Sequence, residues 1–279
     1  MKIRRQLMKQ LQTNQKNFSL LSCSTRSILL GSVLGDGSLK IHKGYKNARF
    51  SFRHSIKQQE YFMWKRNAIR NELSSSKDMW EQLPSESNVS EWQAHKLRYQ
   101  SRALPALSYL HLVIHKGGDL GRIRIRRKWL NILTAQSLAI WWCDDGSLVN
   151  NTKQGVFCTD GFSLKDVQVL DRYMKKVWNI NTAIFPVGKT KKDGTQRYRL
   201  WIRSVAELQK FLRIIIPYIP VYSMLYKVII LYKNSELQQR WISEIVENSQ
   251  YDFNQVSNLV NKRKSELKAF SENDIVHSL

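Results

Sequence analysis

Apolar and polar residues alternate along two stretches of the chain, each about as long as a β-hairpin. In the first stretch, Leu39 and Ile41 alternate with Lys40 and His42, and the alternation resumes after a short turn over residues 49–53. A period of two places successive side chains on opposite faces of a strand. We therefore predict a half-buried antiparallel hairpin, with phenylalanines on one face and basic or polar groups on the other.

The second alternating stretch repeats this plan later in the chain. A turn at residues 192–194 is predicted to lead into a strand over residues 197–203, with Tyr198, Leu200 and Ile202 on one face and basic residues on the other.

Two further stretches have the periodicity of a helix, one after the first alternating stretch and one before the second. Residues 55–73 are predicted to form a helix. A second helix is predicted to begin at Ser163, because Asp166 lies at the spacing of a capping box and apolar residues then recur at helical intervals.

The chain also contains an approximate internal repeat. Asp-Gly-Ser-Leu occurs at residues 36–39 and again at 145–148, an offset of 145 − 36 = 109 residues, and each copy follows an apolar stretch of helical length. A duplicated unit of this size is a small domain rather than a solenoid repeat. We call Asp36 and Asp145 the two motif acids.

Small residues in the two apolar stretches predict a close helix crossing. Gly31 and Gly35 lie four positions apart and share one helix face, as do Ala139 and Cys143 in the second copy. Helices without bulky side chains at the crossing point can approach closely, which would place the two motif acids side by side. The neighbouring tryptophans 141 and 142 are predicted to be core residues.

The chain is therefore predicted to have four parts. They are a basic N-terminal arm (1–22), a first half (23–120), a second half (121–234) and a polar, helix-prone C-terminal extension (235–279).

The charge balance indicates a polyanionic partner. Lys and Arg number 45 against 22 acidic residues, a net charge of +23, with a pI near 10.0. Such a field attracts nucleic acid above all, with an anionic membrane surface or the ribosome as alternatives. No apolar run reaches the ~20 residues that span a bilayer, so an integral membrane protein is not expected. The acid-free first 35 residues resemble an organelle transit peptide in composition, but we favour a basic arm that contacts phosphates.

Metal ligands of the soft or imidazole type are not predicted. His111 and His115 lie four apart, but the run 109–114 is predicted to be a strand, so a zinc helix is not expected there. The cysteines are odd in number and widely separated, which fits neither a disulfide framework nor a zinc site: Cys23, Cys143 and Cys158.

The two motif acids instead predict a site for hard divalent cations. Two adjacent carboxylates repel each other, and shared divalent cations relieve that repulsion. Oxygen ligands without His or Cys indicate Mg²⁺, with Mn²⁺ as a substitute. A pair of metals about 4 Å apart can activate water and stabilise the leaving oxygen of a phosphodiester.

At this point the sequence resembles the LAGLIDADG homing endonucleases, in their single-chain form with two motifs. Residues 29–37 and 138–146 look like the two signature motifs. Residues 133–142, 157–163 and 217–227 are similar to further family segments, so that the resemblance covers roughly residues 26–232.

The resemblance implies an α+β fold of two pseudo-symmetric αββαββα halves, with saddle-shaped antiparallel sheets and two central packed motif helices. It implies that Asp36 and Asp145 bind metal and position the attacking water. Lys227 aligns with the basic residue of the second site, and Arg122 falls closest to its counterpart at the first, with Lys128 as the nearest lysine. These assignments make Asp36, Asp145, Lys227 and Arg122 the predicted catalytic residues.

The seventh motif positions flank the two acids. Gly35 and Asp144 occupy them, and we include both in the predicted metal site beside Asp36 and Asp145. The repeat aligns Asp145, not Asp144, with Asp36, so Asp144 is expected in an outer position or facing solvent.

Basic residues on the predicted strand faces and turns are the predicted DNA-binding set, because arginine matches the acceptor edge of guanine and also binds phosphate. They are Lys40, His42, Arg49, Arg53, Lys189, Lys191, Lys192, Arg197, Arg199 and Arg203.

The resemblance implies hydrolysis of both strands of a long, asymmetric double-stranded DNA target, with 3′ overhangs. It further implies a monomer, intron RNA as a further partner, and an organelle, mitochondrion or chloroplast, as the location. The expected origin is an intron, with an intein or a free-standing gene as alternatives. The main rival is an RNA maturase that assists intron splicing, with or without DNA cleavage. A second rival is a DNA-binding regulator with vestigial acids.

Overall fold

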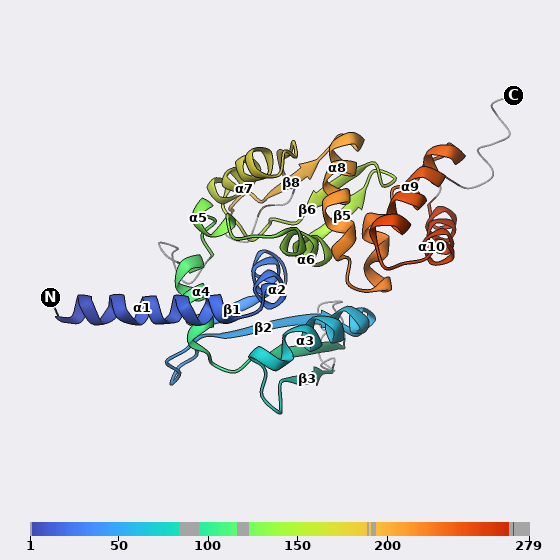
Figure 1. Cartoon of the computed structure of the whole chain (residues 1–279). Coiled ribbons are helices and arrows are strands. Elements are labelled where there is room, and N and C mark those ends of the chain that lie inside the picture. The colour runs from blue at the N-terminus through green and yellow to red at the C-terminus, as the bar shows by residue number, and fades with distance from the viewer. Residues whose placement is uncertain are drawn as a thin grey trace, which may run out of the picture. The chain divides into compact units, whose positions relative to one another are not determined.

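The chain divides into two compact units, Met1–Asp144 and Asp145–Leu279. The computed structural model describes residues 2–83, 95–115, 123–188, 190, 194–267 and 270. Each unit carries its own four-stranded sheet with helices, and both can be followed in Figure 1. The predicted four-part division of the chain stays a prediction.

Unit 1 contains the first predicted hairpin and the two motif helices, α2 and α6, which lead to Asp36 and Asp145. Its elements are α1 (Lys2–Leu20), α2 (Cys23–Leu34), β1 (Ser38–Lys40), β2 (Arg49–Ser55), α3 (Gln59–Leu73), β3 (Met79–Gln82), β4 (Lys96–Gln100), α4 (Pro105–His115), α5 (Arg127–Leu130) and α6 (Ala135–Asp145), whose last residue opens unit 2.

The sheet of unit 1 has the order β1-β2-β4-β3, with antiparallel pairing throughout. Along β2, Phe50, Phe52 and His54 are buried, whereas the residues between them are partly or fully exposed. The predicted hairpin and the helix that follows it are confirmed. The alternation works because one face of the sheet packs against helices and the other stays open.

Unit 2 repeats the order of elements. It contains β5 (Gly146–Val149), β6 (Gln154–Phe157), α7 (Leu164–Val177), β7 (Ala183–Pro186), β8 (Tyr198–Ile202), α8 (Val205–Ile215), α9 (Ser235–Asn248) and α10 (Phe253–Ser265). Its sheet order is β5-β6-β8-β7. The predicted α+β fold of two αββαββα halves is confirmed.

Local sequence accounts for the start of α7. Ser163 caps the helix, and its side chain accepts a hydrogen bond from the backbone N–H of Asp166. The capping spacing predicted this start correctly, because a capping hydroxyl satisfies a backbone donor that has no partner within the helix.

The prediction of a strand at residues 109–114 is wrong, because these residues belong to α4. Leu110 and Ile114 are buried and lie one helical turn apart, whereas Leu112 between them is 42% exposed. The apolar residues at 110, 112 and 114 imitate the alternation of a strand. The rings of His111 and His115 stack on each other, with their centroids 4.2 Å apart.

The two motif helices cross at close range, as predicted. A Cβ on Gly31 would lie 2.4 Å from the Ser137 carbonyl oxygen and 2.8 Å from the Ile140 Cβ. A Cβ on Gly35 would lie 2.4 Å from the Asp144 Cβ. The glycines therefore face Ser137, Ile140 and Asp144, whereas Ala139 and Cys143 were predicted at the crossing.

Both tryptophans of α6 lie in the core, as predicted: Trp141 is 1% exposed and Trp142 is fully buried.

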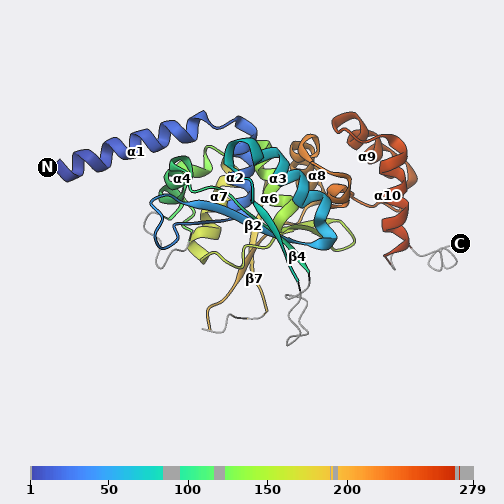
Figure 2. The same ribbon diagram turned by 90° about the horizontal axis from the view of Figure 1, so that it is seen from below.

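The polar tail forms the two helices α9 and α10, which pack against each other in unit 2, and Figure 2 shows them from below. Trp241 anchors α9 by donating its indole N–H to the Val228 carbonyl at 3.0 Å. Among the described residues, no helix is both long and apolar enough to cross a membrane.

Replacing Gly31 with alanine should lower the free energy of unfolding by about 1–3 kcal/mol, because the added Cβ overpacks the crossing of α2 with α6. Chemical denaturation measures this change. The control is Gly161→Ala, where a Cβ meets nothing within 4 Å and stability should change by less than about 1 kcal/mol. Equal losses in both variants would contradict the close crossing.

Candidate nucleic-acid and metal site

Asp36 lies at the rim of a hollow on the sheet of unit 1. Helix α2 ends at Leu34, Gly35 caps it, and the side chain of Asp36 remains 42% exposed. The hollow has a volume of about 350 Å³. Its lining comes from all four strands or the residues beside them: Asp36, Ser38, Lys40, His42, Ser51, Phe52, Arg53, Trp80, Arg98, Tyr99 and Gln100.

This hollow brings together several residues that the sequence predicted separately. Lys40, His42 and Arg53 were predicted to bind DNA, and they share the hollow with the motif acid Asp36. Arg49 lies beside them, donating to the Gln100 side chain at 2.9 Å and stacking over the Tyr45 ring. Basic groups around one carboxylate can hold a phosphate backbone near a catalytic acid.

Arg98 and Trp80 also line the hollow, and sequence reasoning missed both. Trp80 lies in β3 and Arg98 in β4, and the pairing of these two strands was not predicted. The guanidinium of Arg98 lies 5.7 Å from the centroid of the Trp80 ring. The alternating run at residues 96–100 carried the signal, with Leu97 and Tyr99 buried between polar side chains.

Asp144 is buried, which excludes the solvent-facing placement considered for it. Its side chain is 0% exposed. One carboxylate oxygen, Oδ1, accepts hydrogen bonds from Lys65 Nζ at 2.7 Å and from the Tyr61 hydroxyl at 2.8 Å. The other, Oδ2, accepts from the backbone N–H of Asp36 at 3.3 Å. Asp144 thus contacts the first motif acid through its backbone.

Lys65 and His54 complete this cluster, and neither was predicted. The side chain of Lys65 is 0% exposed, and its Nζ lies 3.3 Å from His54 Nε2 and 4.5 Å from the centroid of the Tyr61 ring. On the other side of the imidazole, His54 Nδ1 lies 3.6 Å from Asp36 Oδ2. Burial raises the pKa of the Tyr61 hydroxyl well above its usual value, and the negative charge of Asp144 raises it further.

The same cluster includes a candidate set of metal ligands. Asp36, His54 and Asp144 each offer a ligand atom, and these atoms lie within 4.8 Å of one another. The half-exposed carboxylate of Asp36 fits a hard divalent cation such as Mg²⁺. Asp144 fits one less well, because the ammonium group of Lys65 already lies against it.

Unit 2 places Lys227 and the start of β5 together. Asp145 ends α6, and its carbonyl oxygen accepts a hydrogen bond from the Cys158 N–H at 2.9 Å. Lys227 is only 6% exposed and donates to the Gly146 carbonyl at 3.0 Å. Lys227 thus contacts the residue that follows the second motif acid, and its catalytic role stays a prediction. The pairing of Asp36 with Asp145 joins different units and stays a prediction.

Arg199, one of the predicted DNA contacts, forms a two-pronged ion pair. Its Nε and Nη2 lie 2.8 and 2.9 Å from the two carboxylate oxygens of Asp160. The hydrogen bonds to Asp160 raise the pKa of the guanidinium. Burial raises the pKa of the nearby Cys158 thiol; the charges of Arg199 and Lys227 act against this shift, and that of Asp145 adds to it. The guanidinium of Arg203, which is exposed, lies 5.1 Å from the Phe185 ring centroid.

The remaining predicted site residues are less informative. Arg197 is partly exposed next to β8, and Lys128 is exposed on α5. Four predicted residues lie outside the described part of the chain: Arg122, Lys189, Lys191 and Lys192.

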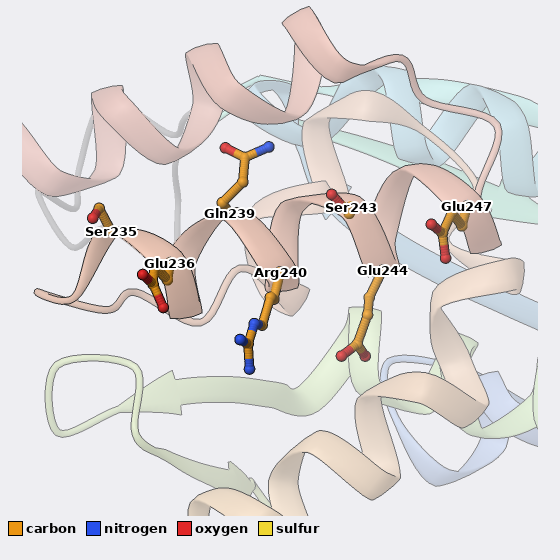
Figure 3. A pocket seen from close by; sticks show the side chains of 7 residues that line it. All are labelled: Ser235, Glu236, Gln239, Arg240, Ser243, Glu244 and Glu247. Atoms are coloured by element: carbon orange, nitrogen blue, oxygen red, sulfur yellow. The ribbon is translucent and has the colours of Figure 1, made fainter.

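A larger hollow of about 830 Å³ lies along α9, away from these residues in sequence and in chemistry. Figure 3 shows that its polar side chains line a single helix, from Ser235 to Glu247. Glu244 is engaged by Arg213 at 2.7 Å. The side chains spread along the helix rather than converge on one point, so this surface offers no catalytic constellation.

Comparison with known proteins agrees with the two-motif geometry. The sequence profile of the LAGLIDADG DNA endonuclease family matches residues 26–211, which include both motif acids and both sheets. The chain belongs to the LAGLIDADG DNA endonuclease family. The homing endonuclease I-WcaI bound to its DNA recognition sequence has a similar fold, with a TM-score of 0.61 and 23% sequence identity, over 79% of this chain and 92% of that one.

Curated relatives of this LAGLIDADG protein include proteins with different names. The cytochrome b mRNA maturase bI2 of Saccharomyces cerevisiae is 29% identical over 77% of this chain and 50% of its own length. The DNA endonuclease I-ChuI of Chlamydomonas applanata is 26% identical over 75% of this chain and 95% of its own. The match to protein RecA of Mycolicibacterium chitae covers 47% of that protein. The chain thus spans about half the length of several relatives.

Tyr99, in the wall of the hollow, should make stability fall at high pH. Burial raises the pKa of its hydroxyl from 10.0 to about 12. Because the folded protein holds this proton more tightly than the unfolded chain, the contribution is full below about pH 10 and is lost as the pH approaches 12. Between pH 10 and pH 12, the free energy of unfolding of the wild type should therefore fall by about 2 kcal/mol more than that of Tyr99→Phe.

Denaturation titrations at pH 9 to 12 measure this difference. At neutral pH the variant should be destabilised by about 1 kcal/mol, because the hydrogen bond between the Tyr99 and Ser74 hydroxyls is removed. Tyr218→Phe, at an exposed tyrosine, is the matched control and should follow the wild-type curve. Parallel curves for wild type and Tyr99→Phe would refute the burial effect.

Proposed function

We propose that this LAGLIDADG protein is a site-specific double-strand DNA endonuclease, a homing endonuclease, that acts on a long asymmetric target. The observation that carries the proposal is the hollow in unit 1, where the motif acid Asp36 lies among Lys40, His42, Arg53 and Arg98. Its repeat, Asp145, is followed by Gly146, whose carbonyl accepts a hydrogen bond from Lys227 in unit 2. A carboxylate beside basic groups on an open sheet suits phosphodiester hydrolysis better than simple binding, because binding alone has no use for the acid.

In this proposal, Asp36 and Asp145 would each bind a divalent cation, Mg²⁺ or Mn²⁺, from the end of its own motif helix. A divalent cation held there would supply an activated water and charge stabilisation at the leaving oxygen. The basic residues of the hollow hold the phosphate backbone, and Lys227 provides a positive charge beside the second acid. We further propose that the protein acts as a monomer. We also propose that it acts in an organelle, in line with a cytochrome b mRNA maturase among its relatives.

Replacing either motif acid should abolish double-strand cleavage. With Mg²⁺ and a randomised or candidate intron-insertion DNA library, the wild type should cut one long site. Asp36→Asn and Asp145→Asn should each reduce the rate by at least about 1,000-fold, because each removes a charged metal ligand. DNA binding in Ca²⁺ should persist in both variants.

The matched control is Glu236→Gln, which removes one negative charge from the exposed face of α9 and should cut like the wild type. Cleavage at the wild-type rate by both aspartate variants would refute the assignment of these acids. Binding without cutting by the wild type would refute nuclease activity itself.

The arginines of the hollow should contribute to the salt dependence of DNA binding. Arg53→Ala or Arg98→Ala should reduce the slope of log K against log salt concentration by about 0.9 for each phosphate that the variant no longer neutralises. Fluorescence anisotropy in Ca²⁺ across a salt series measures the slope. Arg240→Ala on α9 removes an equal charge outside the hollow and should leave the slope unchanged. Equal slopes for all four proteins would exclude the hollow as a phosphate-binding surface.

An RNA maturase is the second candidate, favoured by the similarity to the yeast maturase bI2. It would use the same basic surfaces on intron RNA and would not require the motif acids. Splicing of intron RNA that persists in the Asp36→Asn/Asp145→Asn double variant would reveal this activity, with or without DNA cleavage. A regulator with vestigial acids would bind one DNA site and break no strand with any divalent metal.

A further inference from the structure

We propose that His54, Lys65 and Asp144 act together as positioning residues for Asp36, and that they serve only the active site built on Asp36. This inference rests on the proposed endonuclease function. Its basis is a closed ring of contacts: the Asp36 N–H reaches Asp144, Asp144 bonds to Lys65, Lys65 to His54, and His54 faces the carboxylate of Asp36.

The buried charge pair fixes the centre of this ring. Lys65 and Asp144 both have 0% exposed side chains and lie 2.7 Å apart. Burying an ammonium group without a partner carries a large desolvation cost, so each charge holds the other in place. The Tyr61 hydroxyl adds a second donor to the same carboxylate oxygen, at 2.8 Å. Asp144 is thereby oriented with its other oxygen toward the Asp36 backbone.

Lys65 also determines which nitrogen of His54 carries the proton. An ammonium group only donates hydrogen bonds, so Nε2 of His54, 3.3 Å away, must accept. The proton of the neutral ring then lies on Nδ1, which faces Asp36 Oδ2 at 3.6 Å. Asp36 is thus held through its backbone by Asp144 and approached at its carboxylate by an N–H group of His54. Both contacts restrict the direction in which this acid points.

The corresponding positions of unit 2 carry different residues. Phe52 pairs with Tyr99, and Phe157 pairs with Leu200 at the same place in the second sheet. Counting two residues onward, His54 corresponds to Thr159, whose hydroxyl donates to the Tyr198 carbonyl at 2.7 Å.

The helices give the same correspondence. The buried series Phe62, Lys65 and Ile69 in α3 matches Val167, Leu170 and Met174 in α7. Lys65 therefore corresponds to the apolar Leu170, and in the motif Asp144 corresponds to Gly35. Among the described residues, the ring of contacts belongs to the first site alone.

A metal ion bound by Asp36, His54 and Asp144 together is the competing interpretation. These three residues offer ligand atoms within 4.8 Å of one another. The ammonium group of Lys65, however, lies 2.7 Å from Asp144 and 3.3 Å from His54, so a divalent cation there would be repelled by a buried positive charge. Lys65 takes the place of a cation in this cluster and leaves Asp36 to bind the metal.

The test measures cleavage of each DNA strand separately in variants that install the residues of unit 2. They are His54→Thr and the charge-balanced double variant Lys65→Leu/Asp144→Gly. Cleavage of one strand should slow by roughly 10- to 100-fold and that of the other by less than about 3-fold, as expected when the partner of a metal ligand is removed. Nicked circles should then accumulate from a supercoiled plasmid that carries the target.

A matched control comes from the adjacent residue of α3. Arg66 forms another ion pair with a buried acid, Asp78, at 2.7 Å, and neither side chain belongs to the ring of contacts. Arg66→Leu/Asp78→Ala should lower the thermal stability but should slow the two strands equally, if at all. Equal slowing of both strands in the His54 and Lys65/Asp144 variants would overturn the proposal, as would wild-type rates in both.

A spectroscopic readout separates this inference from the endonuclease proposal. In the full-length protein with ¹⁵N-labelled histidine, His54 should show the tautomer protonated on Nδ1, and Lys65→Leu/Asp144→Gly should populate the one protonated on Nε2. Electron paramagnetic resonance should show weaker Mn²⁺ binding to the His54→Thr complex with DNA. If the wild type cuts no DNA but His54 is protonated on Nδ1, the endonuclease proposal fails and the arrangement of the ring of contacts still stands. If His54 in the wild type is protonated on Nε2, the positioning role is overturned whether or not the protein cuts DNA.

Discussion

The close crossing of α2 and α6 is the constraint on which the first site depends. Gly31 leaves space for the backbone of α6 at Ser137, and Gly35 leaves space for Asp144. Because no Cβ separates the helices there, a carboxylate from one helix can reach the backbone of Asp36 at the end of the other. Larger residues at these glycines would force the helices apart and pull Asp144 away from its partners.

The crossing also explains why so much polarity is buried next to the core. Asp144 enters a region that contains aromatic residues, where a fully buried lysine, Lys65, neutralises its charge, and the Tyr61 hydroxyl and the Asp36 backbone N–H donate further hydrogen bonds to it. Polar groups inside a protein stabilise a single arrangement only when all of them are bonded. The same contacts that allow the helix ends to meet therefore also restrict the orientation of the exposed acid. Packing and function are coupled at this point.

The two halves share topology but differ in chemistry. Both sheets follow the same strand order, and both place an acid at the end of an apolar helix. The first half surrounds its acid with histidine, a buried lysine and an open basic hollow, whereas the second has Lys227 and the Arg199–Asp160 pair nearby. Because the surroundings of the two acids differ, each half can contact different groups of a ligand.

Sequence alone determined the repeat, the two hairpins, the helix cap at Ser163 and the position of the motif acids at the ends of two apolar helices, because these depend on local periodicity and on residue types at fixed spacing. It misplaced residues 109–114, where a helical face imitates strand alternation. Only the tertiary structure decided that Asp144 is buried, that Lys65 is its partner, and that β4 brings Arg98 into the hollow that Asp36 also lines. These contacts join residues distant in sequence, and no local pattern encodes which buried charge meets which.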